Sequence, residues 1–527
     1  MADYIKPGTN FIEGTEYSAD AKILHIYQSD GTAVNDQVYY SFSGWGSHTI
    51  HTAFFIRRKK NIVLDFNGAV LRLHGRIQPF IIDECENVTI KNVTVEYARS
   101  PFTELRIEDV SNGYMRLKTL QNFPCRVENG LLIPYGEDWE NKDLNKGNMF
   151  MQAFDSSSGE GRGLLVCVIG ENIEESTTPP AFVHKYNVSG EKDEVILKGN
   201  FPEYWDSSMT VALAHEGRDI SSVQICRSEN IHIENYRILN GQGMGILGMY
   251  SKDIYISGLK LTRDEFSHGI VTNGADAVHI VASKGVVDIR DSIFEGMIDD
   301  ALNVHTVYLE VEKIAGNVLR LLCHPERHMI RADFKLLDAG DEIIVHRKNT
   351  MEEKGTVTVR DYSVPDADHI DIKVSSTEGI EKGDYVENSS TQPELTISNS
   401  VFKKANSHLR IQTGGKSGIF DCDISLPLML TGDTNYWQEA SRVNDLTIKD
   451  CRFRGDRGYI RICPEFNITD KAPYYHKNIS LIGCSFERKC ILEAYAADNI
   501  TVSECRVSDG TDPEFSMTKC GTISVTN

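Results

Sequence analysis

The chain has 527 residues, more than one ordinary compact core contains, so we expect several domains or an elongated repeat fold. An apolar fraction of 40% suffices for a folded core and excludes disorder. Lys and Arg total 55 against 76 Asp and Glu, which gives a formal charge of −21 without any basic stripe. Nucleic acid and acidic polysaccharides are therefore disfavoured as partners, and a neutral sugar fits better.

The sequence contains no membrane or export signal that we can identify. No stretch of about 18 apolar residues occurs, so no membrane span is predicted. The N-terminal residues 1–4 lack the basic and apolar regions of a secretory signal. We therefore expect a cytoplasmic protein, or a secreted one if a signal peptide has been removed.

One pattern returns along the chain: alternating apolar residues, a small or polar pair, and a second apolar alternation. Several successive copies lie about 21 to 33 residues apart, as in the coils of a parallel β-solenoid. The alternation makes each copy a pair of strands with one face inward, and the central Asn, Asp, Ser or Gly pair supplies the bend. The copies are residues 87–95, 230–238, 253–261, 286–294, 394–402, 445–453, 478–486 and 499–507.

These repeats predict an all-β protein, a right-handed parallel β-helix (solenoid) with two inserted small antiparallel β-barrel-like domains. The inserts are expected where strand-like runs continue without the coil pattern. In chain order we predict N-terminal coils at 1–100, a first insert at 101–216, coils with the catalytic aspartates at 217–307, a second insert at 308–390 and C-terminal coils at 391–527.

Four of the 12 cysteines, Cys422, Cys451, Cys484 and Cys505, occupy one position of the repeat. This spacing predicts a stacked column of small buried side chains. A metal site or disulfide bonds are the alternatives, although no CxxC pair occurs.

An acidic cluster follows from the coil register. Aligning the apolar positions of residues 275–280, 299–304 and 406–411 places three segments over one another. In this register Asp276 lies directly above Asp300, about 5 Å away on the next coil, with Asp299 beside them at the bend.

Three carboxylates this close cannot all ionise cheaply, so at least one should keep its proton near neutral pH. Glycoside hydrolysis needs that arrangement: a protonated acid for the leaving oxygen and an ionised base or nucleophile. These residues are compatible with both inversion and retention of configuration at the anomeric carbon. The alternatives are Asx-turns or an Asn/Asp ladder, and a calcium site, which the absence of a DxDxD run disfavours.

A second, outward-facing column consists of His279, Asn303 and Arg410, and Arg461 and Glu493 extend it. Arg410 follows just below the aspartate pair. A buried cation is costly without an acidic partner, so we expect Arg410 to bind a hydroxyl or to hold one aspartate ionised.

Residues 272–279 (TNGADAVH) and 297–305 (MIDDALNVH) resemble the signature of glycoside hydrolase family 110, and so do 241–246 and 432–439. That family contains α-galactosidases acting on terminal α-1,3-linked galactose in blood group B and linear α-Gal structures. The resemblance implies an inverting exo-hydrolase with no metal or organic cofactor and with Asp276, Asp299 and Asp300 as catalytic residues. The chain departs from the pattern at Thr306, where we expect glycine.

Trp437 is a candidate platform for the apolar face of galactose, and a covering of the solenoid side is the alternative. His268 lies in a loop and could bond a sugar hydroxyl. The candidate substrate-binding residues are His268, His279, Asn303, His305, Arg410, Trp437 and Glu439.

Two other functions compete with the galactosidase. A polygalacturonase-type hydrolase is suggested by Asn273, Asp276 and the Arg410-Ile411 pair, but the acidic composition argues against pectin. A non-catalytic carbohydrate-binding solenoid would show no carboxylate cluster at one coil register. The expected partner is a neutral oligosaccharide or glycoconjugate. The exposed ends of a stack need covering, so a homo-oligomer stays open.

Overall fold

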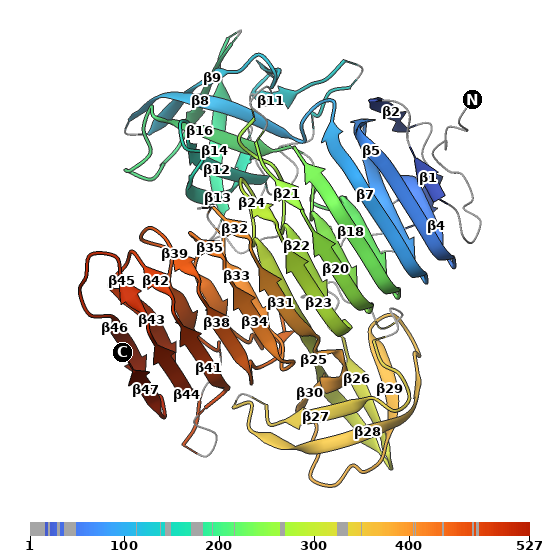
Figure 1. Ribbon diagram of the computed structural model, residues 1–527. Helices are drawn as coiled ribbons and strands as arrows, with labels where there is room; N and C mark the ends of the chain where they lie inside the picture. The colour runs from blue at the N-terminus through green and yellow to red at the C-terminus, as the bar shows by residue number, and fades with distance from the viewer. Residues whose placement is uncertain are drawn as a thin grey trace.

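The structure is a computed structural model in which β-strands dominate (Figure 1). A 3₁₀ turn, η3 (Ser389–Thr391), lies between two of the strands. Among the residues that the structure describes, no helix has the length and apolarity of a membrane span. The described residues are 16–18, 22–28, 32–35, 49–111, 113–137, 139–142, 149–169, 183–191, 193–215, 217–263, 269–323, 332, 336–348, 350–403, 405, 407–434, 437–465, 468–470 and 474–526.

The coils of a parallel β-helix form the body of the molecule, and each coil contributes strands to three faces. The long face runs through most coils and alternates buried and outward residues, as period-2 sequences require. Its strands are β1 (Glu16–Ser18), β5 (Lys60–His74), β7 (Glu86–Tyr97), β18 (Glu229–Ile238), β20 (Lys252–Ser257), β23 (Lys284–Arg290), β31 (Glu394–Ser398), β34 (Ser417–Phe420), β38 (Leu446–Lys449), β41 (His476–Ile482), β44 (Ala497–Ser503) and β47 (Ile523–Thr526).

A sharp bend separates the long face from a short second face. Residues at this bend adopt positive φ, for example 57° at Asn92 and 49° at Asn235, and the Asn235 side chain donates to that of Asn92. Asn tolerates this left-handed conformation better than most residues, which explains the polar pair of the repeat. The long strands β5, β7 and β18 run through the bend, so that their second halves lie on the short face. The other short-face strands are β2 (Ile23–Tyr27), β21 (Lys260–Leu261), β24 (Ile293–Phe294), β32 (Val401–Phe402), β35 (Asp423–Ile424), β39 (Arg452–Phe453), β42 (Ser485–Phe486) and β45 (Arg506–Val507).

The third face, here called the site face, carries the acidic cluster. Its parallel ladder continues through both halves of the chain, interrupted in sequence but not in space by the inserts. β3 (Thr32–Asn35) pairs antiparallel with its first strand. The strands of the site face are β4 (Thr49–Arg57), β6 (Ile77–Asp83), β17 (Val223–Cys226), β19 (Ile246–Met249), β22 (Val278–Val281), the start of β25 (Leu302–Ala315), β33 (Leu409–Gln412), β36 (Leu428–Leu430), β40 (Ile460–Ile462), β43 (Cys490–Tyr495) and β46 (Glu514–Thr518).

The sequence repeats predict the pairing of the coils correctly. Ile231 and Ile238 of β18 lie opposite Val88 and Val95 of β7, although a whole insert separates the two copies in sequence. The copies found in the sequence did not include the coil of β5 or the coil formed by β34 and β35. The predicted fold class is therefore confirmed, whereas the proposed domain boundaries stay a prediction.

The interior of the β-helix is an apolar core of mixed composition in which some identical side chains stack on successive coils. Phe294 stacks on Phe402 with ring centroids 4.6 Å apart. Cys422, Cys451 and Cys484 are buried one above another, and each thiol donates to a backbone carbonyl. All twelve cysteines are free, so the column fills the core and forms no disulfide.

The first insert is a closed barrel between β7 and β17. Its strands pair antiparallel, except that β13 and β14 run parallel. A hairpin of β10 (Cys125–Glu128) and β11 (Leu131–Pro134) lies beside it. The barrel strands are β8 (Phe102–Ser111), β9 (Tyr114–Thr119), β12 (Met149–Asp155), β13 (Gly161–Ile169), β14 (Val183–Ser189), β15 (Glu194–Lys198) and β16 (Met209–Ala214).

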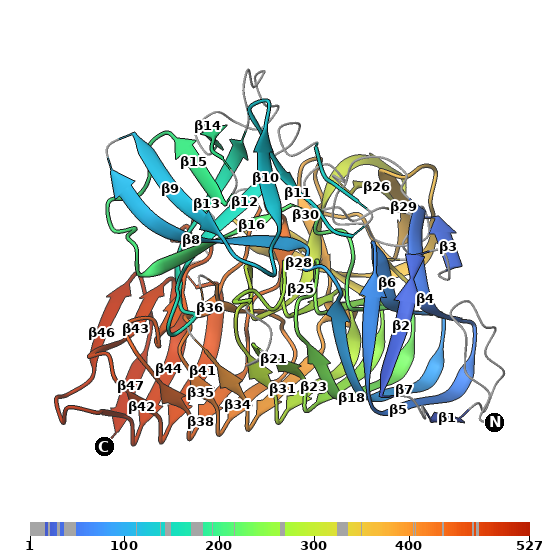
Figure 2. The same cartoon turned by 90° about the horizontal axis from the view of Figure 1, so that it is seen from above.

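The second insert grows directly out of the site face. β25 begins as a solenoid strand and continues into an antiparallel barrel, and it pairs on the way with β37 (Glu439–Ala440). The remaining barrel strands are β26 (Val318–Leu322), β27 (Glu342–His346), β28 (Glu353–Ser363), β29 (His369–Val374) and β30 (Tyr385–Asn388). Figure 2 shows the long-face strands along one edge and both inserts on the opposite side of the molecule.

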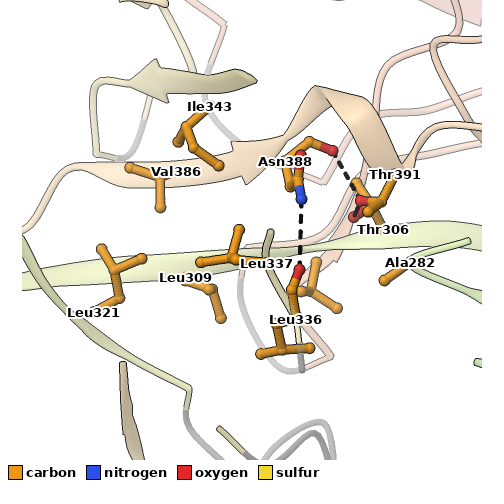
Figure 3. Close-up of a pocket in the computed structure, with 11 residues that line it drawn as sticks. Ala282, Thr306, Leu309, Leu321, Leu336, Leu337, Ile343, Val386, Asn388 and Thr391 are labelled. Atoms are coloured by element: carbon orange, nitrogen blue, oxygen red, sulfur yellow. Dashed lines mark hydrogen bonds between the residues drawn. The ribbon is translucent and has the colours of Figure 1, made fainter. Parts of the chain in front are cut away.

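A small cavity lies where β25 enters the second insert (Figure 3). Apolar side chains such as Leu309 and Leu337 surround most of it, and Asn388 donates to the carbonyl of Leu336 at its edge. Its free volume of about 10 Å³ is at the lower limit for one water molecule. The cavity therefore belongs to the junction between insert and solenoid and has no room for a sugar.

Candidate active site

The predicted register of the acidic coils is confirmed. Val278 of β22 pairs with Leu302 of β25, which pairs in turn with Leu409 of β33. The Ala277 amide donates to the carbonyl of Asp300 at 2.9 Å, which puts Asp276 and Asp300 at equivalent positions of successive coils.

Asp300 forms hydrogen bonds with His408 and Arg410 of the next coil. Its Oδ1 accepts from the backbone amide of His408 at 3.0 Å and contacts the ring nitrogen Nδ1 at 3.1 Å, while Oδ2 accepts from Nε of Arg410 at 3.0 Å. Burial alone would raise the pKa of Asp300, but the His408 hydrogen bond and the Arg410 charge outweigh it and lower this pKa. Asp300 is therefore ionised at neutral pH.

Asp299 is the offset and most accessible member of the cluster. Its side chain is 42% exposed, against 8% for Asp300 and 7% for Asp276. Oδ2 forms an ion pair with Arg218, a residue just ahead of β17, and Oδ1 accepts from the Asp300 amide at 3.1 Å. Asp299 is thus the aspartate that an incoming ligand can reach most directly.

Asp276 has the opposite environment to Asp300. It is buried, and its Oδ2 lies 2.6 Å from Nδ1 of His279. Burial, followed by the charges of Asp299 and Asp300, raises the pKa of Asp276 well above its ordinary value. The two stacked aspartates therefore differ in ionisation: Asp300 is charged, and Asp276 retains a proton together with its histidine.

Glu439 organises the outward column beside the aspartates. It comes from β37, which pairs antiparallel with β25. One oxygen accepts from Nδ2 of Asn303 at 3.1 Å and the other from Nε2 of Gln412 at 2.8 Å. Since a carboxylate only accepts hydrogen bonds, these contacts fix the orientation of both amides.

Asn303 presents an unused acceptor in the site. With Nδ2 directed to Glu439, its Oδ1 faces the other way and is buried without a hydrogen-bond partner. A buried acceptor left unpaired costs free energy, so the group is prepared for an external donor such as a sugar hydroxyl. On the predicted column it stands between His279 and Arg410.

The remaining predicted residues lie as follows. Arg410 also donates to the hydroxyl of Thr431 at 3.3 Å. Below Arg410 the column continues through Met429, which the sequence analysis did not include, and then through Arg461 and Glu493, at one coil each. Trp437 is 44% exposed, and its backbone amide donates to Asp433. His268 lies outside the described residues.

Three residues of the site were missed by the sequence reasoning. Arg218 reaches Asp299 from a turn without repeat character, so the sequence offered no signal for it. His408 stands two residues before Arg410, on the same side of the chain, and this alternation could have indicated it. Gln412 follows from the same alternation.

The contacts of Asp300 bear on the Asx-turn interpretation of the cluster. The carboxylate oxygens of Asp300 accept hydrogen bonds from His408 and Arg410 and do not form a local Asx-turn. Within the described part of the chain, no group of three or more His, Cys, Asp or Glu residues is arranged to hold a metal ion. The arrangement instead offers three carboxylates in three different environments.

Comparison with known proteins finds relatives that carry the name alpha-1,3-galactosidase. The alpha-1,3-galactosidase B of Bacteroides thetaiotaomicron is 23% identical over 85% of this chain and 73% of its own length. The alpha-1,3-galactosidase A of the same species is 25% identical over 90% of this chain and 84% of its own length. For the alpha-1,3-galactosidase B of Akkermansia muciniphila the identity is 23%, with 84% of this chain and 56% of the relative covered.

The predicted resemblance to α-1,3-galactosidases is thus confirmed at the level of homology. No family model matches the chain. Among solved structures, a family 28 exopolygalacturonase of Yersinia enterocolitica covers 95% of this chain and 78% of its own, with a TM-score of 0.30 and 9% identity. A structure titled glycoside hydrolase has the same TM-score, 8% identity, and covers 88% of this chain and 89% of its own.

Proposed function

We propose that the protein is an exo-acting glycoside hydrolase that releases terminal α-1,3-linked galactose from glycans of the blood group B or linear α-Gal type, with inversion. The name shared by its relatives supports the substrate. The observation that carries the proposal is the stacked pair of Asp276 and Asp300, one protonated and one ionised, with Asp299 offset and accessible.

The environments suggest a role for each carboxylate. Asp300 is the general base: it takes a proton from the water that attacks the anomeric carbon. Asp276 lies one coil above and orients this water. Asp299 is the most exposed member and stands off the stacked pair; once its ion pair with Arg218 opens and it takes up a proton from solvent, it gives that proton to the oxygen of the glycosidic bond as the bond breaks. The products are galactose and the shortened glycan.

Recognition of the sugar is assigned to the column beside the aspartates. The Oδ1 atom of Asn303 accepts one hydroxyl, and Arg410 lies beside it with its ion-pair partner Asp300. Trp437 offers an exposed indole face for stacking. All of these groups suit a neutral sugar. No cofactor is needed for the roles proposed, and the cytoplasmic location and the oligomeric state stay predictions of the sequence.

A leaving-group comparison tests the roles. Wild type, Asp299→Asn and Asp300→Asn are assayed on Galα1-3Gal and on a dinitrophenyl α-galactoside, whose leaving group needs no proton. Loss of a general base lowers kcat by about 10² to 10⁴ on both substrates, whereas loss of the acid spares the activated one. We expect Asp300→Asn to lose activity on both substrates, and Asp299→Asn to lose it on Galα1-3Gal but not on the dinitrophenyl galactoside.

Two results would overturn these proposals. A wild type that releases no sugar from any α-galactoside would refute the substrate, and hydrolysis of polygalacturonate instead would favour the pectin-type alternative. Aspartate variants that match wild type would refute the site. Proton NMR of the first anomer released decides between inversion and retention, since an inverting enzyme releases β-galactose first.

A further inference from the structure

Two histidines behind Asp276 engage all of their ring nitrogens within the protein. His279 contacts Asp276 through Nδ1 at 2.6 Å and His305 through Nε2 at 2.9 Å. Nδ1 of His305 lies 2.6 Å from the carbonyl oxygen of Thr306. Both rings are buried, at 9% and 4% exposure. Neither histidine therefore has a nitrogen left for a sugar, although the sequence suggested both as substrate ligands.

The carbonyl of Thr306 determines where the hydrogens lie. A carbonyl only accepts, so Nδ1 of His305 carries hydrogen. In neutral His305 the other nitrogen, Nε2, is then an acceptor and takes the Nε2 hydrogen of His279. His279 consequently turns a lone pair toward Asp276 unless it is charged. The short contact between them exists because Asp276 and His279 share one proton.

Neutrality of His305 follows from its surroundings. Burial lowers the pKa of His305 to about 4 and prevails over the Glu439 carboxylate, whose Oε1 lies 3.7 Å from Nε2. The other charged groups that face the two rings are Arg410 of β33, Arg218 ahead of β17, and Asp299 and Asp300 ahead of β25. The His305 ring is therefore uncharged at neutral pH, and only an uncharged ring can accept a hydrogen bond from His279 through Nε2.

We propose that His305 is a positioning residue of this site, which acts through His279 to keep one shared proton on the Asp276–His279 pair. Asp300 then carries the negative charge of the stacked aspartates. The inference rests on the proposed glycosidase function and deepens it. Asp276 keeps its second oxygen free to accept a hydrogen from the nucleophilic water, while Asp300 removes the other.

Without His305, His279 can change tautomer or rotate, and Asp276 loses its proton partner. Two ionised carboxylates on adjacent coils would then repel each other across about 5 Å and compete for the same water. The rate of the chemical step should fall, whereas substrate affinity should change little, because neither histidine touches the sugar.

Two substitutions separate this role from a merely structural one. His305→Phe preserves a ring but has no acceptor for His279, whereas His305→Gln offers an amide oxygen near the position of Nε2. We expect His305→Phe to lower kcat at least about tenfold with KM within about threefold, and to move the basic limb of the kcat–pH profile to lower pH. His305→Gln should recover most of kcat. His369→Phe, in the second insert, is the matched control and should behave as wild type.

Equal loss of kcat in both variants, in proportion to a fall in Tm, would overturn the proposal. So would a His305→Phe enzyme with the kcat and pH profile of wild type. Either outcome would show that His305 contributes only to packing.

Nitrogen NMR supplies a readout that needs no turnover. In protein labelled with ¹⁵N-histidine, the His305 signals are identified by their loss in His305→Gln. We expect the Nδ1–H tautomer of a neutral ring at pH 7, and an Nε2–H tautomer or a cation would refute the relay. Lack of activity on α-galactosides would refute the proposed function instead, so the two failures are distinguishable.

Discussion

At the scale of single residues, the chemistry depends on how differently three aspartates are surrounded. Asp300 receives hydrogen bonds from His408 and Arg410, while Asp276 faces a histidine inside the protein and Asp299 faces Arg218 at the surface. Carboxylates with equal surroundings would share a proton without preference. Here the neighbours decide which group is ionised before any substrate arrives.

Arg410→Gln should show the contribution of that charge. Without the guanidinium the pKa of Asp300 rises, so the base becomes protonated at higher pH and the acidic limb of the kcat/KM profile moves upward in pH. We expect a loss of about tenfold or more in kcat/KM at pH 6, and a smaller loss at pH 8. Arg461→Gln, two coils below in the same column, is the control. An unshifted acidic limb would contradict the role of Arg410.

Trp437→Ala separates a sugar platform from a cover of the solenoid. The indole is 44% exposed, so its removal should leave Tm nearly unchanged. Loss of a stacking contact of about 0.5 to 1.5 kcal/mol should raise KM for Galα1-3Gal roughly two- to tenfold. A lower Tm with unchanged KM would identify the residue as a cover.

The residues of the site were only partly predictable. The alternation of apolar residues sufficed to place Asp276 over Asp300 and to put Asn303 and Arg410 in one column. Arg218 could not be found this way, since it comes from a turn, where no period exists. The distinction between ligand and support also needed coordinates: His305 looks like any outward polar residue until its two hydrogen bonds are known.

At the scale of elements, the loop that leads to Asp276 is hydrogen-bonded to the first insert. Glu104 of β8 is buried and accepts the backbone amides of Ile270 and Val271 at 2.7 and 3.0 Å. Burial raises the pKa of Glu104 to about 7 despite these bonds and two nearby arginines. The insert therefore holds the coil of Asp276 through a group that titrates near neutrality.

Glu104→Gln should change how stability depends on pH. The folded pKa of about 7 lies above the unfolded value of 4.5, so wild type binds the extra proton when folded. This contribution is complete below pH 4.5 and is lost as pH rises through 7, by about 3 kcal/mol in total. Chemical denaturation from pH 5 to 8 should show the decline in wild type and a flatter profile in Glu104→Gln. Parallel profiles would contradict this interpretation.

The coil of β34 and β35 shows why element prediction was incomplete. Gly418 replaces the side chain expected at an outward position, and the ring of Phe420 occupies the space beside it, with Cε2 2.3 Å from where a Cβ would be. The apolar alternation is weakened at Ser417, which takes the inward position that Leu395 and Leu446 hold in the neighbouring coils, although the backbone continues the ladder between β31 and β38. The coil of β5 keeps the alternation and was nevertheless missing from the copies found, so an intact pattern did not by itself ensure recognition.

At the scale of the whole molecule, stability is local, because each coil contacts only its neighbours. The central coils are covered on both sides by pairing strands. The coil of β46 and β47 has mostly exposed or half-buried side chains, with Val525 50% exposed, and pairs on one side with β43 and β44.

Hydrogen exchange should follow this gradient. Amides of β47 should exchange at least about a hundredfold faster than those of β34, since local opening of an end coil exposes little apolar surface. Mass spectrometry of peptides from both strands measures the ratio. Equal protection would mean that the solenoid opens as one cooperative unit.

The continuity of β25 has a mechanical consequence. This strand holds Asn303 and His305 in the solenoid and then becomes the first strand of the second barrel. If the chain is stretched from its C-terminal end, coils should peel off singly, each adding roughly 75 to 120 Å of contour for the 21 to 33 residues of a repeat. Detachment of β33 withdraws His408 and Arg410 from Asp300 in the same event. Under load, then, the site should come apart in order: Trp437 and Glu439 detach first, and Asp300 loses its partners when β33 follows, while the coils from β4 to β22 are still wound.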